Sequence, residues 1–306
     1  MAVADINFDL AERTGQRYGA RAYRNHMDVM GDSSIDLVSI AVPTALHFKV
    51  ATDALRARKH VLVEKPIAST VDEALALIRT ARSSGVVFGV GHVERFNPVI
   101  SATKSALDAG AIGRPLQIII RRIGPRPARP KDVGVFLDLA THDIDIIRYL
   151  TSEDISGMSA ESLKLSPDGV EDAAVGLMKL ASGTVCTIIE NWISPTKIRD
   201  VTIVGETGML VADTLTQDLY QYDNDYASTD WLAIQNLRGM TDGRMVRHRL
   251  PKGEPLRIEL EHFVRSISSG DPFPVTGEEG LRALEISIRL RSLADDTSRH
   301  TPSNTI

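Results

Sequence analysis

Only one cysteine, Cys186, occurs in the sequence, and this scarcity excludes two kinds of protein. A single thiol cannot form an internal disulfide framework or the thiolate cluster of a structural zinc site. We expect this cysteine to be buried, because it lies in the apolar run 184–189. Metal binding through other residues is not expected either, since His, Asp and Glu do not cluster at the spacing of metal ligands.

Long hydrophobic runs and blocks of charge of one sign are also missing. No apolar run approaches the roughly 18 residues of a membrane span, and no basic segment leads into an apolar one at the N-terminus. Lysine and arginine are interleaved with aspartate and glutamate, and the net charge is −5, so nothing indicates binding to nucleic acid or to an anionic membrane. These features predict a cytoplasmic protein.

The start of the chain lacks a glycine-rich phosphate-binding loop. A doubly wound nucleotide-binding domain normally begins with a strand, this loop and a helix whose amino end binds pyrophosphate. Residues 1–5 instead have the pattern of the second strand, which ends in an acidic residue, Asp5. Gly89 and Gly91 come too late in the chain to form the loop. We expect about 30 residues to be missing upstream. The alternative is a protein that never had the first strand.

The first part of the chain does contain a regular alternation of strand-like and helix-like segments. Apolar runs at 35–40, 61–63 and 86–91 alternate with helical periodicity at 46–58 and 71–82. Such alternation predicts a doubly wound parallel sheet. We assign it to a nucleotide-binding domain, residues 1–92, that lacks its first strand.

Residues 93–306 follow a different pattern and are expected to form a second domain. Strand-like runs are separated by turn residues, of which Ser182-Gly183 and Gly205–Gly208 are typical of hairpins. The runs are 116–122, 173–180, 184–192, 201–204 and 209–212, and helix-like segments follow at 255–269 and 278–294. We predict an open-faced, mostly antiparallel sheet with helices on one face. Its uncovered face predicts a homodimer or homotetramer.

Glu64, Lys65 and Pro66 directly follow a run that is expected to be a buried parallel strand. Ligands of open α/β sheets bind at the carboxyl ends of such strands. A lysine there can hydrogen-bond a substrate hydroxyl and promote loss of its proton. Asp5 is placed to accept both ribose hydroxyls of NAD and to repel the 2′-phosphate of NADP, unless it is an exposed aspartate at a turn.

A second group of polar residues lies in the segment 136–149. Asp138, His142, Asp145 and Tyr149 recur at spacings of four, three and four, so on a helix they would form one polar stripe. His142 with Asp138 one turn earlier suits a general base oriented by a carboxylate. The alternative is an ordinary amphipathic surface helix.

The Glu64-Lys65-Pro66 motif, the Asp138-x-x-x-His142 helix and the open second domain together resemble the glucose-fructose oxidoreductase/inositol dehydrogenase/MocA family. The resemblance covers almost the whole chain. It implies a Rossmann domain that binds NAD, with NADP less favoured, and a dehydrogenase that acts on CH–OH groups. It implies that Lys65 and His142 act on the substrate hydroxyl, with Asp138 as the helix carboxylate. The implied cofactor-binding residues are Asp5, Val42, Pro43, Thr44, His47, Glu64, Lys65 and Pro66.

Within this family, the segments 91–98, 122–127, 132–147 and 190–199 look most like those of UDP-N-acetylglucosamine 3-dehydrogenases. The resemblance implies hydride transfer to NAD from a secondary hydroxyl of a sugar or nucleotide sugar, such as the 3-hydroxyl of a UDP-N-acetylhexosamine or its uronate. Basic side chains would bind the diphosphate or carboxylate, and an indole would stack on a base or sugar. The predicted substrate-binding residues are Arg95, Phe96, Asn97, Arg122, Trp192, Lys197 and Arg199.

Three alternatives stay open at this point. Each basic residue can be a solvated surface charge, and Trp192 can belong to the core. The substrate can be a free inositol or sugar, with the arginines taking no part in binding. The chain can also be a non-catalytic ligand-binding regulator or an inactive product. The absence of the glycine loop favours this last interpretation, and the presence of both Lys65 and His142 opposes it.

Overall fold

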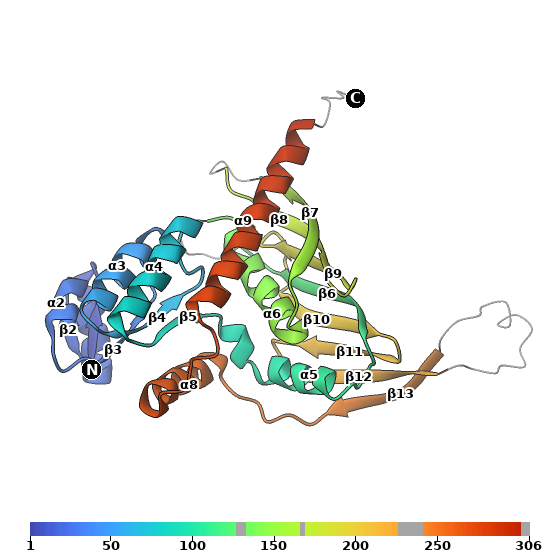
Figure 1. Cartoon of the computed structure of the whole chain (residues 1–306), viewed down its shortest axis with the longest axis horizontal. Coiled ribbons are helices and arrows are strands. Elements are labelled where there is room, and N and C mark those ends of the chain that lie inside the picture. Colours follow the sequence, from blue (N-terminus) through green and yellow to red (C-terminus); the bar gives the residue numbers. More distant parts are fainter. Residues whose placement is uncertain (127–132, 166–168, 226–240, 301–306) are drawn as a thin grey trace, which may run out of the picture. The chain divides into compact units, whose positions relative to one another are not determined.

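The structure is a computed structural model that describes residues 1–126, 133–165, 169–225 and 241–300 (Figure 1). The chain divides into two compact units. The first unit comprises Met1–His92 and Glu259–Glu285, and the second comprises Val93–Ile258 and Ile286–Ile306. No helix within the described ranges is both long enough and apolar enough to cross a membrane.

Parallel strands form the centre of the first unit, as predicted. β1 (Ala2–Ala4) pairs with β2 (Arg21–Tyr23), and a second sheet has the order β3 (Leu37–Ile40), β4 (His60–Glu64) and β5 (Phe88–Gly91). The three central residues of β4 are buried, which agrees with its unbroken apolar sequence. The parallel, alternating pattern is therefore confirmed, as two separately hydrogen-bonded sheets.

Helices connect these strands, and α4 has clear capping residues at both ends. They are α1 (Phe8–Tyr18), α2 (His26–Gly31), α3 (Thr44–Arg56) and α4 (Val71–Ser84), with α8 (Pro255–Ser269) from later in the chain. α4 begins at a capping box, in which the Thr70 hydroxyl accepts from the Glu73 N–H at 3.3 Å and the Glu73 carboxylate accepts from the Thr70 N–H at 3.2 Å. It ends at Gly85, whose left-handed φ of +67° is easily adopted by glycine.

The two glycines of the Gly89-Val90-Gly91 sequence serve packing on strand β5. A Cβ atom added to Gly89 would lie 2.4 Å from the ring of Phe273, and one added to Gly91 would lie 3.3 Å from the backbone of Glu64. The Val90 N–H donates to the carbonyl of Val275, so the segment before α9 runs beside this strand. The structure thus agrees that these glycines form no phosphate-binding loop.

An eight-stranded sheet forms the second unit, in the order β13-β12-β11-β10-β6-β9-β8-β7. All neighbouring pairs are antiparallel except β6 with β9, which are parallel, so the sheet is mixed. The predicted hairpins are confirmed between β8 and β9 and between β10 and β11. The strands are β6 (Pro115–Ile123), β7 (Ile155–Leu163), β8 (Ala173–Leu180), β9 (Val185–Asn191), β10 (Ile198–Gly205), β11 (Gly208–Asp213), β12 (Asp218–Asp225) and β13 (Thr241–His248).

Helices pack on one face of this sheet. They are η1 (Val93–Phe96), α5 (Pro98–Asp108), the π-helical turn η2 (Phe136–Ala140), α6 (Thr141–Thr151) and the second half of α9 (Gly277–His300). In β8, Ala174 and Met178 are buried toward the helices, whereas Val175 and Leu177 are exposed on the other face. Cys186 is fully buried, as expected, and burial raises the pKa of its thiol to about 12.

Candidate cofactor edge and catalytic helix

In the first unit, two loops follow the carboxyl ends of the neighbouring parallel strands β3 and β4. Val42 and Pro43 lie in the first loop, and Thr44 begins α3. Glu64 ends β4, and the half-buried Lys65 precedes the buried Pro66. Because β3 and β4 pair in parallel, both loops emerge at the same edge of the sheet, where ligands of such sheets bind.

His47 joins these two loops. Its Nδ1 lies 2.7 Å from the carbonyl oxygen of Pro66, and its Nε2 lies 2.9 Å from the carbonyl oxygen of Val42. The ring is buried, and both nitrogens are occupied by backbone groups. The ring therefore holds together the loops that carry Val42 and Lys65–Pro66, and a direct contact of His47 with the cofactor stays a prediction.

Two further features of the first unit suit a dinucleotide. Asp5 follows β1, is half-buried, and has its Oδ1 held by the N–H of Asn7 at 2.8 Å, so its carboxylate is oriented at the end of a parallel strand. The amino end of α3 begins at Pro43, which provides no side-chain cap for the first N–H groups of the helix. Uncapped N–H groups of this kind favour an anion such as a phosphate.

In the second unit, Asp138 lies in the π-helical turn η2, and His142 lies in the first turn of α6. Both side chains are half-buried, and single π-helical turns often mark functional positions. Tyr149 is half-buried as well, so the predicted polar stripe is wrong only at Asp145. Asp143 and Asp145 are almost completely buried, so α6 presents carboxylates to the interior as well as to its outer side.

Arg95 explains why Asp145 can be buried. The guanidinium binds both carboxylate oxygens, with Nη2 to Oδ1 at 2.6 Å and Nε to Oδ2 at 2.8 Å, and it stacks on the ring of Tyr149 at 5.4 Å. Only 8% of the Arg95 side chain is exposed. The structure therefore gives Arg95 a role in holding η1 to α6, and substrate binding by this arginine stays a prediction.

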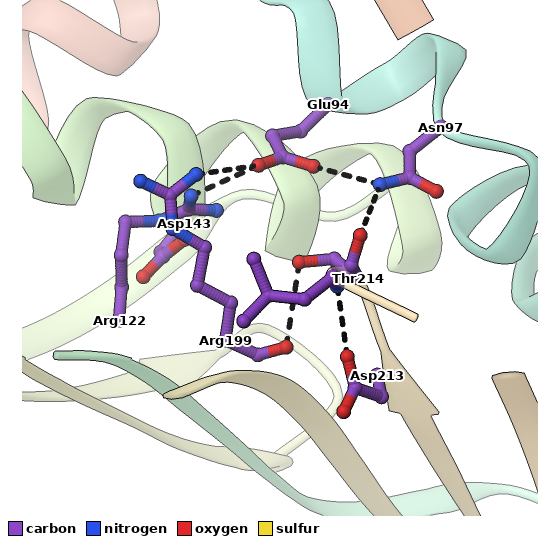
Figure 2. A network of polar contacts seen from close by, with 8 residues as sticks. Glu94, Asn97, Arg122, Asp143, Arg199, Asp213 and Thr214 are labelled. Atoms are coloured by element: carbon purple, nitrogen blue, oxygen red, sulfur yellow. Dashed lines mark hydrogen bonds and ion pairs between the residues drawn. The ribbon is translucent and has the colours of Figure 1, made fainter. Parts of the chain in front are cut away.

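Arg122 is the centre of a buried charge network (Figure 2). Its Nε donates to Asp143 Oδ1 at 2.7 Å, and its Nη1 donates to Glu94 Oε1 at 2.9 Å. The Asn97 side chain donates to Glu94 Oε2 at 3.2 Å and to the Thr214 carbonyl at 3.0 Å. With 3% of its side chain exposed, Arg122 is paired with carboxylates inside the protein, and its predicted contact with a substrate anion stays a prediction.

The pKa values of the network follow from burial and from the pairing with Arg122. Burial opposes the charged form of Glu94, but the charge and hydrogen bond of Arg122 outweigh it and hold the pKa of Glu94 below its usual value. Burial raises the pKa of Asp143, and Arg122 counteracts only part of this rise. Burial lowers the pKa of Arg122, but the charges of Asp143 and Glu94 more than compensate, so that its pKa is raised.

Three other predicted substrate residues are also buried. Trp192 donates from its Nε1 to Asp172 Oδ1 at 2.6 Å, and Asp172 also pairs with Arg126. Phe96 packs in the core, and Asn97 caps α5 through its side chain while it binds Glu94. Core packing, which the sequence left open for Trp192, is therefore the role that the structure supports.

Lys197 and Arg199 differ from these residues. Lys197 is exposed, and Arg199, with 32% of its side chain exposed, reaches Glu94 only at 3.7 Å. Within the described residues, neither side chain donates a hydrogen bond to a carboxylate. The charge of Arg199 lowers the pKa of Lys197, and burial together with the charge of Arg122 lowers the pKa of Arg199. Positive charge is therefore concentrated at this accessible point.

The sequence did not identify Glu94, Asp143 and Glu190 as members of the network. One signal was present for Glu190, since it stands among inward-facing apolar residues on a strand of alternating pattern. No group of three or more His, Cys, Asp or Glu in the described segments is arranged to hold a metal ion.

Comparison with known proteins gives matches along most of the chain. A family model described as an oxidoreductase family with an NAD-binding Rossmann fold matches residues 1–92, and the C-terminal domain model of the same GFO/IDH/MocA family matches residues 100–211. UDP-N-acetylglucosamine 3-dehydrogenase of Acidithiobacillus ferrooxidans is 28% identical over 94% of this chain and 88% of its own length. Myo-inositol 2-dehydrogenase of Thermotoga maritima is 25% identical over 92% of this chain and 85% of its own length.

Solved structures give the same result. UDP-N-acetylglucosamine 3-dehydrogenase from Acidithiobacillus ferrooxidans superposes with a TM-score of 0.83 at 27% identity, covering 96% of this chain and 89% of that one. Levoglucosan dehydrogenase in complex with NADH has the same fold, with a TM-score of 0.83 at 23% identity over 96% of this chain and 87% of that one.

Replacing Arg122 with methionine should destabilise the second unit strongly, because it leaves Glu94 and Asp143 buried without their cation. The expected loss in the free energy of unfolding is about 3–5 kcal/mol. Arg121→Met is a matched control on the same strand, since Arg121 pairs with Asp200 at the surface and should contribute only about 0–1 kcal/mol. Denaturant titration measures both, and equal losses would refute the central role of Arg122.

Proposed function

Because the chain belongs to the glucose-fructose oxidoreductase/inositol dehydrogenase/MocA family and is an NAD-dependent dehydrogenase acting on CH–OH groups, we propose that it oxidises a secondary hydroxyl of a sugar or nucleotide sugar to a ketone. The observation that carries the proposal is the presence, on an NAD-binding fold, of Lys65 at the carboxyl end of β4 and of His142 one turn after Asp138. A non-catalytic regulator would need neither side chain.

Each of these residues has a chemical role in the proposal. Lys65 hydrogen-bonds the substrate oxygen and stabilises the negative charge that develops on it. His142 removes the hydroxyl proton, and Asp138 orients the imidazole. NAD, when bound, supplies the hydride acceptor. Asp5 favours NAD over NADP, because its carboxylate can accept from the ribose hydroxyls and would repel a 2′-phosphate.

We further propose that the substrate carries a diphosphate or carboxylate. A UDP-N-acetylhexosamine or its uronate, oxidised at the 3-hydroxyl, would have this chemistry. Lys197 and Arg199 support this choice, since they are cations beside Arg122 that the described residues leave without a hydrogen-bonded carboxylate. The alternative is a free inositol, which the similarity to myo-inositol 2-dehydrogenase favours.

The homo-oligomer that we propose forms through the outer face of the eight-stranded sheet. Val175 and Leu177 of β8 are 46% and 47% exposed there, and Met245 of β13 is 55% exposed. The helices described for the second unit pack against the other face. A second copy of the chain would cover these apolar side chains symmetrically.

Substitution of Lys65 or His142 should slow turnover strongly and leave NAD binding intact. We expect Lys65→Met and His142→Asn each to lower kcat/KM by roughly 10²–10⁴-fold, the usual contribution of such groups. NADH formation is followed by absorbance with UDP-N-acetylglucosamine, its uronate and myo-inositol, and NAD binding by calorimetry. Lys49→Met, at an exposed position of α3, is the control. A folded protein that binds NAD and a sugar but turns over none of them would support the regulator.

The substrate class is tested by neutralising the exposed cations. Lys197→Met and Arg199→Met should each raise KM for an acidic nucleotide sugar by roughly tenfold, corresponding to about 1.4 kcal/mol, and leave KM for myo-inositol unchanged. Lys49→Met, at an exposed position of α3, is again the control. Equal effects on charged and neutral substrates would count against an anion site and in favour of the inositol alternative.

Oligomer formation is tested by placing a charge on the outer face of the sheet. Light scattering of the wild type should give a dimer or tetramer, and Leu177→Glu should give monomers because the carboxylate would be desolvated in the interface. Leu75→Glu on α4, where the leucine is 36% exposed, should leave the assembly intact. A monomeric wild type would exclude this interface.

A further inference from the structure

Glu190 lies on β9, in a row of charged residues that crosses three strands. In the register of the sheet, Arg199 of β10 lies opposite Arg122 of β6, and Arg122 lies opposite Glu190. The exposed fraction falls along this row, from 32% of the Arg199 side chain to 3% of that of Arg122, while Glu190 as a residue is 1% exposed. Glu190 is thus a carboxyl group at the buried end of the row.

Arg122 does not satisfy this carboxyl group. Its recorded hydrogen bonds go to Asp143 and Glu94, as described above. Among the residues that the structure describes, none forms a hydrogen bond with either buried oxygen of Glu190 or with the buried Oδ2 of Asp143, whose other oxygen binds Arg122. If both carboxyl groups were ionised, Glu190 would be a buried anion without a hydrogen-bond donor, and it would repel the neighbouring Asp143. One proton between them removes one charge and supplies the missing donor.

The charges around Glu190 agree with this arrangement. On β8 its neighbour in register is Ala174, which carries no charge. Asp143 of α6, Asp138 of η2 and Arg122 of β6 are the charged groups that act on it. Burial raises the pKa of Glu190 well above its usual value, the charge of Asp143 raises it further, and Arg122 opposes the rise. Because Arg122 binds Asp143 directly, the proton belongs on Glu190.

We propose that Glu190 is a positioning residue that carries a proton in the folded protein and donates it to Asp143 Oδ2, so that Arg122 and Glu190 together fix the first turn of α6. Asp143 follows His142 directly, so holding its side chain also holds the backbone turn that carries the imidazole. The structural part of this inference stands alone, and its catalytic part rests on the proposed function. Glu190→Gln should preserve the arrangement, because the amide is a donor of nearly the same shape, and Glu190→Leu should not.

Stability as a function of pH tests the protonation. A group with a raised folded-state pKa stabilises the protein below its unfolded pKa, and this contribution is lost as pH rises through the folded-state pKa. The Tm of the wild type should therefore fall relative to that of Glu190→Gln as pH rises above about 4.3, the usual pKa of a glutamate. An infrared band of a protonated carboxyl group should be present at neutral pH in the wild type and absent from Glu190→Gln. A constant difference in Tm with no such band would overturn the proposal.

Activity tests the positioning. Glu190→Gln should retain most of kcat, whereas Glu190→Leu should lower kcat by roughly 10- to 100-fold, as for a displaced catalytic group, and leave NAD affinity unchanged. Equal loss of kcat in both variants would contradict the proposal, because the amide would then fail to replace the acid. The stability and infrared measurements need no substrate, so they distinguish failure of this inference from failure of the proposed reaction. They also decide the question if Glu190→Leu does not fold.

Discussion

The buried pairing of Arg122 with Glu94 and Asp143 is the interaction on which the arrangement of the second unit depends. It joins strand β6 to the turn η1 and to helix α6 through hydrogen bonds of 2.9 and 2.7 Å. Such a cluster need not add stability over an apolar core, because desolvating three charges is costly. The cluster instead fixes geometry. Because Arg122 binds two carboxylates through separate nitrogens, it holds α6 in one position on the sheet. His142 is on that helix, so its position follows from charges buried beneath it.

In the first unit, two loops are held together by a histidine that contacts backbone groups. The two ring nitrogens of His47 lie close to the backbone carbonyl oxygens of Val42 and Pro66. This contact fixes the separation of two loops at the carboxyl edge of the sheet, and Lys65 lies in one of them. In both units, therefore, the residue proposed to touch substrate is only half-buried, and a fully buried polar residue with several partners holds it in place.

Much of the fold could be predicted from the sequence, because buried parallel strands such as β4 are continuous apolar runs and hairpins such as that at Gly183 have glycine at a left-handed φ. Strand β7 was missed because its sequence, ISGMSAESL, is largely polar and small. The residues of the candidate site were harder to predict. Periodicity placed Asp145 on a polar face, but its burial is decided by Arg95, which is 50 residues away in sequence. Likewise, nothing local to Arg122 shows that two carboxylates from other elements neutralise it.

The same distinction separates basic residues that serve the fold from those that can serve a substrate. Composition and spacing gave Arg95, Arg122, Lys197 and Arg199 equal standing, whereas the structure divides them by whether a carboxylate already binds them. A buried guanidinium that already binds Asp143 and Glu94 gains little from an incoming phosphate. Losing those two hydrogen bonds would leave buried anions unpaired. Arg199 gives up only a contact at 3.7 Å. The row from Arg199 to Glu190 therefore has two ends with different proposed roles. Arg199 at the exposed end can bind an anion, and Glu190 at the buried end carries a proton. Arg122 lies between them.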